Sequence, residues 1–247
     1  MVMTALLSAA VSATLLLAPS AAAADDPSAR QLADEARENL RDAESVHLKL
    51  TDRGKDTSTG RTRPASMDLA LDRDGNCAGT LKMARHGGTV EIVKRGKQVW
   101  MKPDTAFWKA QVPGGQGDEV AELFKNRWIH GSTSDAMLKG LADTCDLDSL
   151  QDDIGSGDDP PTALKRGEKT ERDGTDVYPL SGKDEGKNIT MYVTADSPHQ
   201  VAEIVQRGGG TDRSVTFDDY DEPVPTRTPP PEDSVDVDKL QDELQKV

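Results

Sequence analysis

The chain has 247 residues and carries 44 acidic against 30 basic side chains, which gives a formal net charge of -14. A surface this acidic repels phosphate backbones, so we do not expect nucleic acid as a partner. Hydrophobic residues make up only 35% of the chain and aromatic residues 4%, so the core must be thin or supported by a cross-link.

The first 24 residues have the pattern of a signal peptide. An apolar run from Ala5 to Leu17 is followed by alanines at 22–24, which is typical of a signal-peptidase cleavage site. The run is too short for a stable membrane helix, although a buried N-terminal helix is an alternative. No cysteine follows the run to accept a lipid. We therefore predict a secreted, extracytoplasmic protein of the cell envelope that is not lipid-anchored and begins near Asp25.

Residues 25–46 predict an amphipathic helix. Asp26 is placed to cap its first turn. Leu32, Ala36 and Leu40 then share one stripe, with charged residues outside it. Apolar and polar residues begin to alternate directly afterwards, so a first strand follows the helix.

The next stretch predicts a meander of short strands on one sheet. Apolar and polar side chains alternate with a period of two, which places the apolar ones on a single face. Pairs such as Asp74-Gly75 and Arg95-Gly96 lie where the chain must reverse, and glycine supplies the positive φ that hairpin turns need. The four predicted strands span residues 67–71, 77–83, 89–93 and 98–101.

The chain has two cysteines, Cys77 in this meander and Cys145 in a helical middle segment. In an exported protein an even number of cysteines indicates a disulfide, with two free thiols as the alternative. Cys145 follows Met137 and Leu141 at intervals of four residues, so the three share one apolar helical face. That face should point at the sheet carrying Cys77, which favours the bond.

Strand patterns return after residue 164, at 175–181, 188–195, 200–207 and 214–220. Prolines from residue 223 onward end the regular pattern, and a short helix is predicted at 238–245. We therefore expect a signal peptide at 1–24, one domain at 25–222 and a Pro-rich, acidic tail at 223–247. The order of helix, strands, helices and strands predicts an α+β fold with an antiparallel sheet.

No motif in the chain predicts catalysis, a metal or a cofactor. His47, His86, His130 and His199 stand apart without the spacing of metal ligands, so we interpret them as surface or turn residues. Residues 72–76 begin like a calcium loop, but the glutamate required at the twelfth position is missing, and a β-turn explains them better. There is no G-x-S-x-G or S-x-x-K sequence for a nucleophilic serine. We therefore expect a protein that is not an enzyme.

Several segments together resemble a known family. The helix leading into a strand is followed by DGNCAGTL, VEIVKRGKQVWMKP, a helical insert, ITMYVTADSPHQVAEIV and VTFDDYDEPVPTRTPP. This order is similar to that of the actinobacterial LppX/LprG lipoproteins, which are relatives of the lipoprotein carrier LolA. The resemblance implies a strongly curved antiparallel sheet, a half-barrel, with helices covering its concave face. In that family the hollow holds acyl chains of lipids or glycolipids in transit across the envelope, so a lipid or glycolipid is the expected ligand and envelope transport proteins are further expected partners.

The resemblance directs attention to the apolar face of the meander and to the helices opposite it. The same alternation would serve equally for a filled core, in a structural or interaction protein of the same fold without a lipid cavity. The expected cavity residues are Met67, Leu69, Leu81, Met83, Val90, Ile92, Val99 and Met101 from the strands and Leu123, Phe124, Met137 and Leu141 from the helices.

Overall fold

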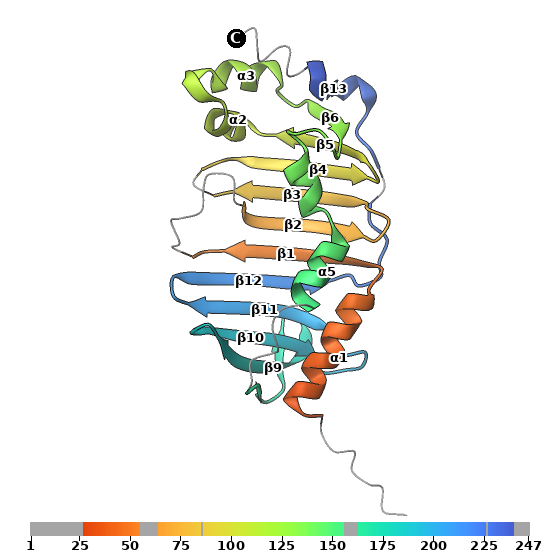
Figure 1. Cartoon of the computed structure of the whole chain (residues 1–247), viewed down its shortest axis with the longest axis vertical. Coiled ribbons are helices and arrows are strands. Elements are labelled where there is room, and N and C mark those ends of the chain that lie inside the picture. The colour runs from red at the N-terminus through yellow and green to blue at the C-terminus, as the bar shows by residue number, and fades with distance from the viewer. Residues whose placement is uncertain (1–26, 55–63, 85, 156–162, 226, 240–247) are drawn as a thin grey trace, which may run out of the picture.

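Period-two alternation extends through most of the chain, and in the computed structural model it builds one large antiparallel sheet that curls around a layer of helices (Figure 1). The structure describes residues 27–54, 64–84, 86–155, 163–225 and 227–239. Among them, 13 strands join a single sheet. The α+β fold class predicted from the sequence is therefore confirmed.

The elements follow one another in the order helix, meander, helical segment, second meander and returning tail. The helices are α1 (Ala29–Asp42), α2 (Thr105–Gln111), α3 (Gly117–Leu123), α4 (Lys139–Thr144) and α5 (Leu147–Gly155), with short 3-10 turns at Pro113–Gly115 and Pro231–Asp233. The strands of the first half are β1 (Ser45–Asp52), β2 (Pro64–Asp72), β3 (Cys77–Met83), β4 (Thr89–Arg95), β5 (Gln98–Pro103) and β6 (Trp128–Ser132). Those of the second half are β7 (Lys165–Arg166), β8 (Thr170–Arg172), β9 (Thr175–Asp184), β10 (Lys187–Thr194), β11 (Val201–Gly208), β12 (Thr211–Asp218) and β13 (Ser234–Asp236).

The strand order places the two meanders side by side through β1. It runs β13-β6-β5-β4-β3-β2-β1-β12-β11-β10-β9-β7, with β8 also paired to β9. Neighbouring strands are antiparallel except that β13 is parallel to β6. Strand β1 thus pairs with β2 from the first half and with β12 from the second, so the middle of the sheet joins distant parts of the sequence.

Helix α1 lies over β10 and β11, with α5 alongside it (Figure 1). Its N-cap is Ser28, which forms a capping box with Gln31, so the predicted start and the capping role of Asp26 are wrong. The Ser28 hydroxyl accepts from the backbone N–H of Gln31, and the Gln31 side chain accepts from that of Ser28, so the pair satisfies two backbone donors. Leu32 and Leu40 are fully buried under the helix, as its apolar stripe predicts.

The sequence prediction omits several elements. Strands β6, β7 and β8 and helices α2 and α5 occupy segments without a predicted element of that kind, and β13 lies in the tail where regular structure was expected to end. The predicted signal peptide lies outside the described residues, and so does nearly all of the predicted helix at 238–245. In the described part of the chain, every helix is too short or too polar to cross a bilayer.

Candidate functional site

The concave face of the sheet carries an apolar cavity where β3, β4 and β5 pass beneath α2 and α4. Leu81 and Met83 of β3 and Met101 of β5 point inward and form its floor. The cavity measures about 590 Å³, within the range of about 300–1,000 Å³ that is common for small-molecule sites. The residues lining it are Pro64, Leu81, Met83, Met101, Phe107, Trp108, Gln111, Val112, Gln116, Met137, Gly140, Leu141 and Thr144.

Helix α2 is held against this part of the sheet by one carboxylate. Asp104 Oδ1 accepts from the backbone N–H of Phe107 at 2.8 Å, and its Oδ2 accepts from that of Thr89 at 2.9 Å. Gly88 lies in the left-handed region at φ +79°, and a Cβ there would stand 2.1 Å from the Phe107 nitrogen. Only glycine permits this approach. The turn therefore fixes Phe107 and Trp108 over the cavity.

Helix α4 is held over the cavity by the disulfide between Cys77 and Cys145, which confirms the predicted bond. Cys77 is the first residue of β3, and Cys145 directly follows α4. Buried Lys94 lies beside the bond and donates from Nζ to the carbonyls of Gly75 at 3.0 Å and Cys145 at 3.4 Å. A cation here stabilises the end of α4, where backbone carbonyls lack donors within the helix.

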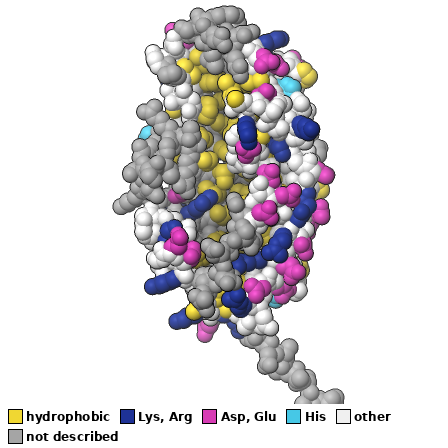
Figure 2. Space-filling model, viewed as in Figure 1, with side chains coloured by type: hydrophobic (Ala, Val, Ile, Leu, Met, Phe, Trp, Pro, Cys, Tyr) yellow, Lys and Arg dark blue, Asp and Glu magenta, His cyan; other side chains and the backbone are white. Residues whose placement is uncertain are grey.

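A second hollow of about 320 Å³ continues along the concave face beneath α5. Thr144 lines both hollows, so they adjoin one another. Figure 2 shows a strip of apolar side chains along the long axis of this face. The second hollow is lined by Leu48, Leu50, Met67, Thr144, Leu150, Ile154, Ile189, Ile204, Gln206, Arg213, Val215 and Phe217.

The lining of the first cavity contains no charged side chain among the described residues. Its polar groups are few. Trp108 is only 4% exposed, and its Nε1 is closed off from solvent without a hydrogen-bond acceptor in the described part of the chain. The cavity therefore suits a largely apolar molecule.

The structure divides the predicted cavity residues into several groups. Leu81, Met83, Met101, Met137 and Leu141 line the first cavity, and Met67 lines the second hollow. Leu69, Val90, Ile92 and Val99 point to the same side of the sheet but are fully buried in the core, outside the lining of either hollow.

The two aromatic or aliphatic residues predicted from α3 lie elsewhere. The prediction that Leu123 faces the cavity is wrong, because its side chain is 51% exposed at the end of the helix. Phe124 is buried, but it packs against Trp108 with ring centroids 5.9 Å apart and does not reach the first cavity. Trp108 therefore lines the cavity, where the prediction had placed Leu123 and Phe124.

The sequence prediction missed the contribution of α2. Phe107, Trp108 and Val112 line the cavity, although the segment containing them was interpreted only as the approach to a glycine-rich turn. Two adjacent aromatic residues in a helix of seven residues are too few to reveal a helical period. The available signal was Asp104, a favourable N-cap residue directly before them.

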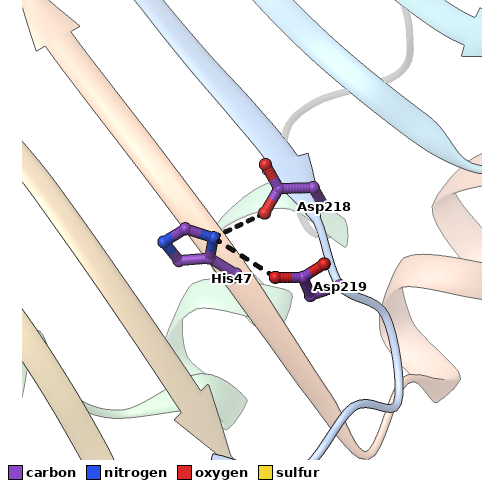
Figure 3. A group of neighbouring side chains, drawn as sticks. All are labelled: His47, Asp218 and Asp219. Carbon is purple, nitrogen blue, oxygen red and sulfur yellow. Dashed lines mark hydrogen bonds and ion pairs between the residues drawn. The ribbon is translucent and has the colours of Figure 1, made fainter. Parts of the chain in front are cut away.

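The convex face carries a cluster of polar side chains around His47 (Figure 3). Its Nδ1 lies 2.6 Å from Asp218 Oδ1 and 3.7 Å from Asp219 Oδ2, while its Nε2 lies 2.7 Å from Asp68 Oδ1. Lys49 donates to the other oxygen of Asp218 at 3.1 Å, and this hydrogen bond raises the pKa of Lys49. The sequence prediction treated His47 as an isolated residue, since Asp218 and Asp219 lie more than 170 positions away along the chain.

The architecture is an open, curled antiparallel sheet with helices and an apolar cavity on its concave face, and one solved mycobacterial structure shares this fold. No protein-family model matches the sequence, and no curated protein does so either. The solved structure of LprF from Mycobacterium bovis matches with a TM-score of 0.55 and 15% identity, over 81% of this chain and 96% of LprF.

Two further solved structures match with lower TM-scores. The lipoprotein LppX from Mycobacterium tuberculosis gives a TM-score of 0.47 and 15% identity, over 79% of this chain and 98% of LppX. A LolA superfamily protein from Nitrosomonas europaea gives a TM-score of 0.24 and 11% identity, over 84% of this chain and 97% of that protein. The likeness to LprF confirms, at the level of the fold, the resemblance inferred from the sequence.

Proposed function

We propose that this protein is a non-catalytic, extracytoplasmic binding protein that holds acyl chains of a lipid or glycolipid for transport in the cell envelope. The observation that carries the proposal is the apolar cavity of about 590 Å³ beneath α2 and α4. The adjoining hollow beneath α5 extends the apolar surface along the sheet, which suits a long chain better than a compact ligand.

The lining chemistry supports an acyl chain over other ligands. Burying a methylene group contributes about 0.8 kcal/mol, so a long chain gains useful affinity without a charged partner. Met83, Met101 and Met137 contribute flexible side chains that adapt to irregular apolar ligands. A charged ligand would find no opposite charge among the described lining residues of the first cavity.

The adjoining hollows favour an extended ligand over a compact one. Both are lined mainly by apolar side chains. The proposed ligand is therefore a molecule with long fatty acyl chains, which lie among the methionine side chains of the first cavity.

The proposal is tested by filling the cavity from Gly140. This residue lies on α4 at the opening of the cavity, and a Cβ built on it meets no atom within 4 Å. Gly140→Phe should lower the affinity for a fluorescent fatty acyl ester by about 10-fold or more while leaving the free energy of unfolding within about 1 kcal/mol of wild type. Gly140→Ala is the matched control, because it changes the same backbone position without filling the cavity and should bind as wild type does.

A second control separates the cavity from the filled core. Val90 is fully buried on the neighbouring strand and lies outside the cavity lining, so Val90→Trp should destabilise the fold by about 1–3 kcal/mol through overpacking. Wild-type protein that fails to bind the probe, and from which no lipid can be extracted and detected by mass spectrometry, would overturn the lipid proposal. That outcome would favour the alternative, an interaction protein of the same fold.

A further inference from the structure

The cluster on the convex face lies where the two halves of the chain meet. In the sheet register His47 of β1 stands directly opposite Asp218 of β12, and Asp68 of β2 lies diagonally across from it. Asp219 follows at the end of β12 and turns toward the same ring (Figure 3). The imidazole is therefore enclosed by carboxylates from both neighbouring strands.

The short distances on both sides of the ring require a cation. A neutral imidazole has one N–H donor and one lone pair, whereas an ionised carboxylate only accepts. His47 nevertheless has a carboxylate oxygen at 2.6 Å from Nδ1 and another at 2.7 Å from Nε2. If Nε2 donates to Asp68, the contact between Nδ1 and Asp218 needs a positive particle. At 2.6 Å that particle is a second proton, and a metal ion takes its place only when small side-chain rotations move the two atoms apart.

Charge and access around the cluster favour a metal ion. Asp68, Asp218 and Asp219 present three carboxylates. Among the described residues, one lysine, Lys49, forms an ion pair with this cluster. A divalent ion would balance the two negative charges that remain beside a neutral imidazole. His47 and Asp219 also line a hollow of about 310 Å³ on this side of the sheet, so the position is open to an ion and to a water ligand.

We propose that His47 Nδ1, Asp218 and Asp219 bind a divalent transition metal ion of the zinc type. The three ligand atoms lie within 4.8 Å of one another, so small side-chain rotations bring them to the distances of about 2.0–2.2 Å that zinc requires. One nitrogen and two carboxylate oxygens suit zinc, while magnesium and calcium prefer ligand sets of oxygen alone. Asp68 is a positioning residue, because its hydrogen bond to Nε2 directs Nδ1 toward the metal.

The test is a zinc titration of the purified protein by calorimetry, in competition with a chelator. Wild type should bind one ion, and His47→Gln should weaken that binding by about 100-fold or more. His130→Gln is the matched control. His130 also lies on the outer face of the sheet and bonds to Gln98 at 2.6 Å, but no carboxylate contact to it is found in the described residues. This control should bind zinc as wild type does.

The role of Asp68 is tested separately with cobalt as a spectroscopic probe. Asp68→Asn should lower the affinity for the metal ion by about 10–100-fold. It should preserve the visible absorption bands of bound Co²⁺, because the three ligands are unchanged. His47→Gln should abolish those bands. Circular dichroism of each variant separates loss of metal binding from loss of fold.

Two outcomes would overturn the proposal. One is zinc binding to wild type that is no tighter than binding to His47→Gln, which would assign the cation beside Nδ1 to a proton alone. The other is an unchanged cobalt spectrum in His47→Gln, which would place the ion elsewhere. Neither result bears on acyl binding, since the cavity lies on the opposite face of the sheet.

Discussion

Two regions of the concave face have the same sequence pattern and different interiors. At α1, Leu32 and Leu40 of the helix and Val193 of β10 are fully buried in a filled core. Beneath α2 and α4, equivalent inward positions such as Leu81 and Met101 line a cavity. The sheet supplies alternating apolar side chains to both regions, so the difference arises from what covers it.

The covering helices differ in length and in the way they are held. Helix α1 has 14 residues, begins with a capping box and places a continuous apolar stripe on the sheet. Helices α2 and α4 have seven and six residues, too few for stable helices of their own, and each depends on a tether. Short helices held at their ends leave unfilled space beneath them. The cavity thus exists because α2 and α4 cover the concave face of the sheet incompletely.

The largest expected effect is removal of the disulfide that tethers α4. Replacing Cys77 and Cys145 together by serine releases a link across 68 positions, which should cost about 4 kcal/mol of unfolding free energy on the chain-entropy account. Urea denaturation measures the loss, and binding of the acyl probe should weaken with it. Probe affinity and stability equal to wild type would mean that α4 holds its position without the tether.

A leucine-to-alanine pair compares the two interiors directly. Leu32→Ala leaves a void in a filled core and should cost about 2–5 kcal/mol. Leu141→Ala removes a half-buried side chain that already borders empty space, so it should cost less than about 1 kcal/mol. Equal losses in urea denaturation would contradict the distinction between core and cavity.

The smallest expected effect on the free energy of unfolding is that of Tyr220, which packs in the filled region and makes stability depend on pH. Its hydroxyl donates to the carbonyl of Val201 at 2.8 Å, and burial raises its pKa. The unfolded chain releases this proton near pH 10, so the contribution of Tyr220 is complete below about pH 10 and falls as the pH rises above it. Tyr220→Phe should cost about 1 kcal/mol at pH 7.

The same variant should also lose less stability than wild type between about pH 10 and 11.5. Tyr178→Phe is the control for general alkaline effects, because Tyr178 also packs against the core and its ring stacks on Arg166. If wild type and Tyr220→Phe lose stability in parallel, Tyr220 does not govern this part of the pH profile.

The sequence predicted the fold well because strand alternation and glycine turns are local signals. It could not separate cavity from core, since Leu81 and Val90 follow the same alternation and are paired across β3 and β4, yet only Leu81 lines the cavity. Some signals were present and missed. Leu147, Leu150 and Ile154 recur at helical spacing in α5. The cluster around His47 had no local signal, because its members meet only through the pairing of β1 with β2 and β12.

The returning strand β13 has a consequence for the solubility of the protein. Without it, β6 would end the sheet with a row of free backbone donors and acceptors, next to the cavity end of the molecule. Such an edge readily recruits a strand from another chain and starts aggregation. β13 covers this row with only three residues and ends in exposed Asp236, so the new edge is short and charged. An edge of this kind disfavours pairing with a strand from another copy.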